Sequence, residues 1–272
     1  MNMKEYNLTI NGNSIFVMES QFIGKSAIVF IHGNSLSSEC FRGLFDSSLS
    51  KMYRLIAFDF PGHGKSSRSV NPEQDYTFLG MVKTLKEVIA ELNLEDYILV
   101  GHSLGGHIAI QASTQLFSKG LVTYGTPPLA IPPAIQEAFI MRQELMQMFT
   151  PEITPEQIHS VGVAFSDNRE SQNLIAAEIA KADPLVRAFI GKSIMENAFI
   201  ADEIVTINEA PFPVLVMLGE KDGMISRKYF ESATLHNLWE NKIHLLKDAG
   251  HCGMMESEGE FGRALDEYVE NV

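Results

Sequence analysis

Short apolar runs of strand length alternate with helical stretches along most of this chain. The mostly apolar runs lie at 27–31, 54–58, 97–100, 121–124, 214–218 and 243–246. Helical stretches are expected at 40–49, 78–92, 104–116, 227–236 and 258–269. Continuous apolar runs are typical of strands that are buried on both faces. Because strands that alternate with helices are joined by right-handed crossovers, we predict an α/β fold with a mostly parallel central sheet and flanking helices.

The chain opens differently, with two segments of alternating polarity at 6–10 and 14–18. Asn11, Gly12 and Asn13 lie between these segments, and an Asn-Gly pair supplies the positive φ angles of a tight turn. We therefore predict an antiparallel hairpin before the α/β alternation begins.

One long interval, 126–208, interrupts the alternation and contains no convincing strand. Pro127-Pro128 and Pro132-Pro133 lead into several helical stretches, the first of them expected at 134–149. We interpret this interval as a helical cap inserted into a single core domain. The predicted boundaries are 1–125 for the first part of the core, 126–208 for the cap and 209–272 for the second part of the core.

The bulk composition excludes several classes of protein. Hydrophobic residues make up 45% of the 272 positions and charged residues 20%, which is typical of a folded globular protein. The formal net charge of −13 repels phosphate backbones and anionic lipid surfaces, so we expect neither nucleic acid nor a membrane as a partner. The N-terminus has no apolar run of signal-peptide length, and Cys40 and Cys252 fit reduced thiols. We therefore expect a cytoplasmic protein, either a monomer or a homodimer.

The segment 101–105, Gly-His-Ser-Leu-Gly, directly follows one predicted strand and directly precedes a predicted helix. This is the context of a nucleophile elbow, a sharp turn that lifts a serine hydroxyl out of a sheet. The glycines permit the turn because they have no Cβ atoms to clash. A Gly-x-Ser-x-Gly pattern also occurs by chance at ordinary turns, but the strand and helix around it favour Ser103 as a nucleophile.

A serine hydroxyl needs a base to take its proton, and the chain has eight histidines. His236 and His244 lie near or within predicted regular structure. His102 and His107 flank the nucleophile, but side chains next to a residue at a sharp turn generally point away from it. His251 lies in a loop after the last strand and before the last helix, where a base can reach over the crevice. We predict His251 as the base.

The acid that orients the base should also follow a strand. The segment 219–222 follows the strand at 214–218 and contains Glu220 and Asp222. The strand that ends at Tyr124 is followed by no carboxylate. We predict Asp222 as the acid, with Glu220 as the alternative. The order Ser, Asp, His along the chain agrees with this kind of fold and not with the chymotrypsin or subtilisin orders.

A developing oxyanion needs two preorganised hydrogen-bond donors. The backbone N–H of Leu104, just after the nucleophile, is the first expected donor. The second is the backbone N–H of Asn34, in the loop after the strand at 27–31. The side-chain amide of Asn34 is a further candidate for contact with the substrate.

These features together resemble the α/β-hydrolase superfamily along almost the whole chain. The segments that carry the resemblance are His32-Gly33-Asn34, Asp59 to Ser66, Gly101 to Gly106, Gly219 to Asp222 and Gly250-His251. A narrower set is similar to the metal-independent N-acyl-homoserine lactonases of this fold: His32 to Ser35, Ser103 to Ile108, Gly125 to Pro128 and Asn237 to Glu240. By this resemblance the chain has the α/β-hydrolase fold and opens a lactone ring, and His159 lies where those lactonases have a substrate-binding tyrosine.

Apolar side chains of the predicted cap fit a hydrophobic lid over an acyl chain, although packing of the cap on the core explains each of them equally well. Phe139 and Met146 are the cap candidates for substrate contact. Met224 and Met254 are close in sequence to the predicted acid and base and are candidates on the core side. No sequence motif of metal ligands is present, so we expect neither a metal nor an organic cofactor.

The predicted activity is cleavage of a small ester or lactone with an apolar acyl part through an acyl-enzyme on Ser103. N-acyl-homoserine lactones are the first candidate substrate. A general carboxylesterase and a carbon–carbon bond hydrolase would use the same residues and stay open as alternatives. A ligand receptor that keeps the hydrolase shell and turns over slowly is the alternative of another class.

Overall fold

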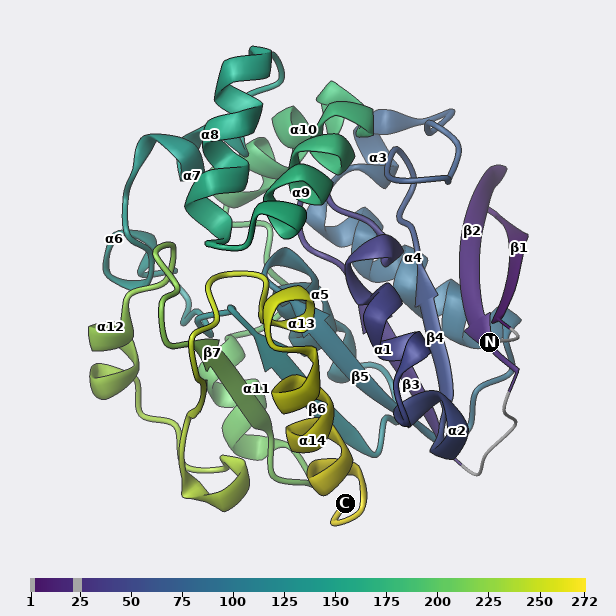
Figure 1. The fold of residues 1–272 in the computed structure, drawn as a ribbon, viewed down its shortest axis with the longest axis vertical. Coiled ribbons are helices and arrows are strands. Elements are labelled where there is room, and N and C mark those ends of the chain that lie inside the picture. The colour runs from purple at the N-terminus through teal and green to yellow at the C-terminus, as the bar shows by residue number, and fades with distance from the viewer. Residues whose placement is uncertain (1–2, 22–25) are drawn as a thin grey trace.

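A computed structural model describes residues 3–21 and 26–272, so residues 1–2 and 22–25 of the predicted first core segment lie outside the described residues. One eight-stranded sheet runs through the molecule in the order β1-β2-β4-β3-β5-β6-β7-β8 (Figure 1). The strands are β1 (Met3–Ile10), β2 (Asn13–Ser20), β3 (Ala27–Ile31), β4 (Arg54–Phe58), β5 (Tyr97–His102), β6 (Gly120–Tyr124), β7 (Leu215–Gly219) and β8 (His244–Leu246).

The sheet is parallel from β4 to β8, and the first two strands are antiparallel. Asn11 and Gly12 connect β1 to β2 with φ angles of 51° and 79°, as the tight turn of the predicted hairpin requires. The mostly parallel α/β architecture predicted from the sequence is confirmed.

Helices cover both faces of the sheet (Figure 1). Side chains alternate between the two faces of a strand. On β3, Ile28 and Phe30 therefore pack with α1 (Arg42–Asp46) and α14 (Glu258–Val269), whereas Val29 and Ile31 pack with α4 (Phe78–Glu91) and α5 (Leu104–Ser113). The helices of the core are η1 (Ser38–Phe41), α1 (Arg42–Asp46), α2 (Leu49–Met52), α3 (Pro72–Asp75), α4 (Phe78–Glu91), α5 (Leu104–Ser113), α12 (Arg227–Ser232), η2 (Trp239–Asn241), α13 (Gly253–Glu256) and α14 (Glu258–Val269).

The chain between β6 and β7 forms further helices, of which α7 to α10 lie above the sheet in Figure 1. They are α6 (Ile135–Ala138), α7 (Gln143–Gln147), α8 (Pro155–Phe165), α9 (Arg169–Lys181), α10 (Pro184–Met195) and α11 (Glu203–Glu209). The last of them, α11, packs against α5 of the core. The cap boundaries at 126 and 208 stay predictions.

The single helix expected at 134–149 is wrong. Phe139 has an extended ψ of 148° and forms an isolated antiparallel bridge with Ile225, so the segment is split into α6 and α7. Two hydrogen bonds reinforce this bridge, from Ile140 N to Met224 O (2.8 Å) and from Ser226 N to Ala138 O (3.0 Å). The inserted segment is therefore attached to the loop that follows β7.

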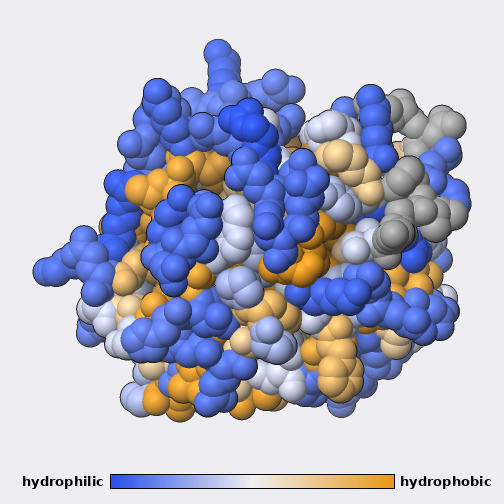
Figure 2. All heavy atoms as spheres, turned by 90° about the horizontal axis from the view of Figure 1, so that it is seen from below, coloured by the Kyte–Doolittle hydropathy of each residue, from blue (hydrophilic) through white to orange (hydrophobic). Residues whose placement is uncertain are grey.

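The surface on the side away from the inserted helices is largely hydrophilic (Figure 2). Figure 2 views the face opposite the inserted helices, and hydrophilic side chains cover most of it, with hydrophobic ones scattered among them. None of the helices in the described ranges 3–21 and 26–272 has the length and apolar character needed to cross a membrane.

Candidate active site

Ser103 occupies the turn between β5 and α5. Its backbone has φ 51° and ψ −120°, a conformation that non-glycine residues rarely adopt and that marks a strained turn. The turn fits tightly against β3: a Cβ atom on Gly105 would lie 2.2 Å from the carbonyl oxygen of Ile31. A glycine is therefore needed at 105. The side chain of Ser103 lies at the turn itself, outside both β5 and α5.

The structure brings the three predicted residues together. The Nε2 atom of His251 is 3.1 Å from Oγ of Ser103, and Nδ1 of His251 is 2.9 Å from Oδ2 of Asp222. Because a carboxylate only accepts, Nδ1 carries the proton and Nε2 presents its lone pair to the hydroxyl. His251 and Asp222 are buried, with 2% and 9% of their surfaces exposed, so this contact is shielded from water.

Asp222 is fixed from two sides. Its Oδ1 accepts the backbone N–H groups of Met224 (2.8 Å) and Ile225 (3.3 Å), which leaves Oδ2 for His251. Glu220 is exposed, and its carboxylate accepts the N–H of Asp248 (3.3 Å). The alternative acid is therefore turned away from the serine.

The loop that carries His251 is held by residues that the sequence did not single out as positioning groups. Tyr124 Oη donates to Gly250 O (2.6 Å), and His102 Nε2 donates to His251 O (2.8 Å). From the inserted segment, Phe165 O accepts the N–H of His251 (2.8 Å), and the ring of Phe165 packs edge-on against the imidazole at 4.9 Å. Only the position of His102 inside the elbow could have pointed to such a role.

Three histidines buried in the core, His32, His63 and His102, are neutral because burial lowers their pKa values. Burial lowers the pKa of His102 to about 3 and that of His63 to about 4. Burial also lowers the pKa of His32, well below its usual value. A neutral imidazole can donate through one nitrogen only, as His102 does to the loop of the base. These three side chains serve the structure of the core.

The two predicted oxyanion donors lie on neighbouring loops. Leu104 is the first residue of α5, a position whose N–H has no partner within a helix. Gly33 allows the other loop to approach, since a Cβ atom there would lie 3.3 Å from Cβ of Ser103. Within residues 3–21 and 26–272, neither the N–H of Leu104 nor that of Asn34 has a hydrogen-bond acceptor.

The side chain of Asn34 is engaged with protein groups. Its Nδ2 donates to Met148 O (2.6 Å) in the inserted segment, and its Oδ1 accepts from Ser35 Oγ (3.0 Å). The amide therefore ties the loop after β3 to the inserted segment. Contact between this side chain and a substrate would require one of these bonds to break.

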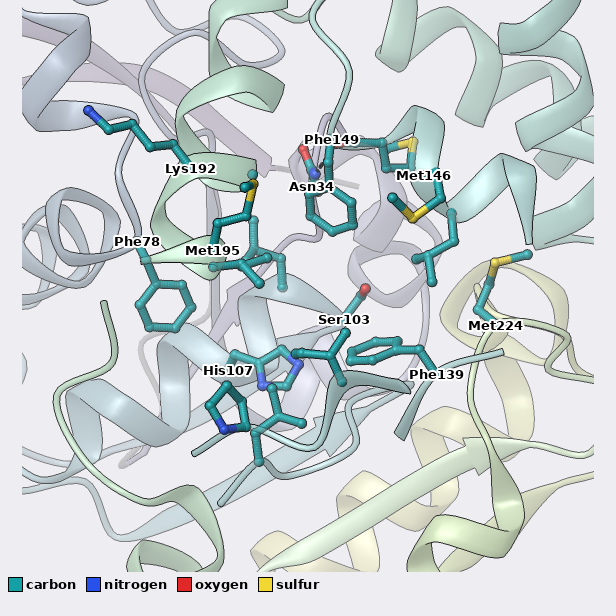
Figure 3. A pocket seen from close by; sticks show the side chains of 18 of the residues that line it. Asn34, Phe78, Ser103, His107, Phe139, Met146, Phe149, Lys192, Met195 and Met224 are labelled. Atoms are coloured by element: carbon teal, nitrogen blue, oxygen red, sulfur yellow. Dashed lines mark hydrogen bonds between the residues drawn. The ribbon is translucent and has the colours of Figure 1, made fainter. Parts of the chain in front are cut away.

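A cavity of about 830 Å³ opens above Ser103, between the core and the inserted helices (Figure 3). Three of the predicted substrate contacts line it, namely Phe139, Met146 and Met224. Met254 does not, because α13 buries it completely in the core. His159 is exposed on α8, whose inward face carries Val161, Gly162 and Phe165. The structure therefore separates His159 and Met254 from the cavity.

The described part of the chain contains no group of three or more His, Cys, Asp or Glu side chains placed to hold a metal ion. Cys40 and Cys252 are both buried free thiols. Burial raises the pKa of both thiols, so they are poor nucleophiles.

A family model described as the alpha/beta hydrolase fold matches residues 26–258. The chain belongs to the α/β-hydrolase family. The hydrolase YugF of Bacillus subtilis, whose function is uncharacterized, is 32% identical over 114 residues, and this match covers 41% of each chain. This α/β hydrolase thus spans less than half of that relative. A Mycoplasma pneumoniae protein provisionally named esterase/lipase 1 is 25% identical over 287 residues, covering 97% of this hydrolase and 98% of the relative.

Solved structures resemble this α/β hydrolase over its full length. The N-acyl homoserine lactonase AidH, in a variant complexed with N-hexanoyl homoserine lactone, has a TM-score of 0.90 at 25% identity and covers 100% of this chain and 98% of its own. AidH complexed with N-butanoyl homoserine gives 0.90 at 26% identity, with coverage of 100% and 97%. An esterase from Exiguobacterium antarcticum has a TM-score of 0.78 at 19% identity, with coverage of 98% and 100%, and shows the fold alone. Together with the esterase/lipase relative, AidH supports an enzyme that hydrolyses esters.

Proposed function

We propose that this α/β hydrolase cleaves carboxylic esters and lactones through an acyl-enzyme on Ser103, and that N-acyl-homoserine lactones are its preferred substrates. One observation carries the serine hydrolase chemistry: His251 lies between Ser103 and Asp222 at 3.1 Å and 2.9 Å, on the floor of a largely apolar cavity. The likeness to AidH and the apolar cavity support the lactone.

The first half of the reaction forms the acyl-enzyme. Nε2 of His251 takes the proton of Ser103 as Oγ attacks the ester carbonyl carbon. Asp222, bonded to Nδ1, stabilises the imidazolium that results. The negative charge on the carbonyl oxygen is stabilised by the free N–H groups of Leu104 and Asn34.

The second half releases the product. His251 gives its proton to the leaving alkoxide, which in a lactone stays tethered to the acyl group. Water, deprotonated by His251, then attacks the acyl-enzyme, and the serine recovers its proton. The product of a homoserine lactone is the open-chain N-acyl homoserine, and no metal or organic cofactor takes part.

The cavity fits a substrate with an apolar acyl chain. Phe139, Met146 and Phe149 point into it from the inserted segment, and Met224 adds a side chain from the loop after β7 (Figure 3). Methionine side chains adapt their shape to ligands of different length. A range of acyl chains is therefore expected to bind.

A carboxylesterase acting on linear esters is the second candidate. The esterase/lipase relative favours it, and it would use the same serine, base and acid. The exposed position of His159 also removes the cap contact that was expected to help bind a lactone. A carbon–carbon bond hydrolase has less support, because the meta-cleavage product hydrolase CumD is 19% identical and shows the fold alone.

Ring opening of N-acyl-homoserine lactones, followed by proton release, tests the proposal. A linear N-acyl amino acid ester of matched acyl length serves as the competing substrate. We expect a higher kcat/KM for the lactone, and the reverse order would favour the carboxylesterase. Ser103→Ala should lower turnover about 10⁴-fold or more while the protein stays folded. The absence of turnover on both substrates, together with no labelling of Ser103 by a fluorophosphonate, would contradict the proposal.

A further inference from the structure

His107 lies one helical turn beyond the nucleophile on α5. Its backbone N–H donates to Ser103 O (3.3 Å), and residues four apart lie on the same face of a helix. Helical side chains also tilt towards the N-terminus of their helix, which here is the end that carries Ser103. His107 lines the cavity near the nucleophile, with only 6% of its surface exposed (Figure 3).

Glu203, at the start of α11, fixes the orientation of this imidazole. Its Oε2 accepts from Nδ1 of His107 (2.8 Å) and from the N–H of Leu129 (2.9 Å), and its Oε1 accepts from Nε2 of Gln111 (3.1 Å). Glu203 is completely buried, so the carboxylate cannot be satisfied by water instead. Because the carboxylate accepts, Nδ1 of His107 carries a proton.

The other ring nitrogen, Nε2 of His107, has no hydrogen-bond partner in the part of the chain that the structure describes. Other polar side chains of the cavity are engaged with the protein: Asn34 with Met148 O and Thr150 with Met146 O. The proposed reaction does not use His107, since His251 faces the serine hydroxyl. Nε2 of His107 lines the cavity, so a bound molecule that displaces water from it must supply a hydrogen-bond partner or leave this polar atom unsatisfied.

We propose that Nε2 of His107 binds the amide of an N-acylated substrate and makes the enzyme select it over a substrate without an amide. This inference rests on the proposed function and identifies the amide as the part of the substrate that His107 recognises. With Nδ1 bonded to Glu203, Nε2 of His107 can accept from the N–H of a secondary amide. In an N-acyl-homoserine lactone the amide is on the carbon next to the reacting carbonyl, and His107 lines the cavity together with Ser103.

Two substrates of equal length separate this role from a structural one. The first is N-hexanoyl homoserine lactone, and the second is a γ-butyrolactone whose alkyl substituent replaces the amide by two methylene groups. The measured quantity is the ratio of their kcat/KM values. For His107→Leu we expect this ratio to fall about tenfold, the effect of one lost hydrogen bond in a buried site. His107→Gln keeps a polar atom near Nε2 and should recover most of the ratio, and the exposed His159→Leu is the matched control.

A loss of kcat/KM that is equal for the two lactones would show that His107 only maintains the structure, and it would overturn the inference. Unchanged ratios in both His107 variants would overturn it as well. The proposed function fails separately, when the unmodified enzyme turns over neither lactone nor linear ester and Ser103 is not labelled by a fluorophosphonate. If linear esters alone are hydrolysed, the same ratio is measured on an N-acylated ester and its alkyl counterpart.

Discussion

The loops at the ends of the core strands and the inserted helices both line the cavity, but they position their residues by different means. The core loops start from strands whose register places their ends side by side: Ile31 pairs with Gly101, His102 with Tyr124, and Gly219 with Leu246. Residues far apart in sequence thus meet because the sheet places them at one edge.

The inserted segment reaches the same site through a few individual contacts. Met148 O accepts from Asn34, Phe165 O accepts from His251, and Phe139 pairs with Ile225. No sheet register fixes these contacts. We therefore expect kcat to depend most on the residues of the core loops. The inserted segment should help to position His251 and determine which substrates bind.

Asp222→Asn is expected to have the largest effect. The asparagine amide can donate to Nδ1 of His251 and then favours the tautomer with a proton on Nε2, which cannot accept from Ser103. We expect kcat for the preferred ester to fall about 10³- to 10⁴-fold, as in other serine hydrolases with this arrangement. Steady-state kinetics measure the change, and thermal denaturation checks the fold.

Glu220→Gln is the matched control for that substitution, since Glu220 is a carboxylate two residues away and exposed. Its activity should stay within about twofold of the unmodified enzyme. Equal losses of kcat in Asp222→Asn and Glu220→Gln would show that Asp222 is not the acid that orients His251.

The free energy of unfolding should decrease as the pH falls below neutral. His32, His63 and His102 are buried and neutral in the folded state because burial lowers their pKa values, to about 4 for His63 and about 3 for His102. The unfolded chain takes up protons on them below their usual pKa of 6.5, so stability is lost as the pH falls from there towards 4. His63 and His102 can each contribute roughly 3 kcal/mol. Burial raises the pKa values of Asp59, to about 6, and of Glu256, and these two oppose the loss only in part.

Chemical denaturation at pH 8, 6 and 4 measures this effect as a decrease in the free energy of unfolding. A free energy of unfolding that stays constant or rises on acidification would contradict the prediction.

The sequence predicted the core loops well because two simple patterns decide them. Apolar runs mark the strands, and loops after parallel strands share one edge, which led to Ser103, Asp222 and His251 without any knowledge of distances. Their geometry agrees with the expected chemistry, although their catalytic roles stay predictions.

The inserted segment was predicted less well from the sequence, because tertiary contacts determine where its helices begin and end and which of their faces meets the cavity. The bridge between Phe139 and Ile225 splits a stretch whose composition suits a helix, and no local pattern encodes a partner 86 positions away along the chain. The inward face of α8 follows from helical periodicity, but which face meets the cavity depends on packing. For this reason Phe165 was missed and His159 was expected at the wrong place.

Phe165→Ala tests how far the inserted segment controls the base. The ring packs on the imidazole of His251 and is 5% exposed, so its removal leaves a space beside the base. We expect a stability loss of about 3 kcal/mol and a decrease in kcat of about tenfold. Val163→Ala on the same helix removes an exposed side chain and is the control. An unchanged kcat in Phe165→Ala would show that the ring of Phe165 does not position His251, which would leave the backbone carbonyl of Phe165 as its contact from the inserted segment.

His159→Ala should have the smallest effect. The side chain is exposed on the outer face of α8, so its removal should change kcat/KM less than twofold for lactone and linear ester, and stability by less than about 0.5 kcal/mol. Phe165→Ala, on the opposite face of the helix, shows that the assays detect a change in α8. A tenfold loss confined to the lactone would mean that α8 rotates on substrate binding, and the inserted segment would then contribute to recognition through a face that the unbound enzyme turns to solvent.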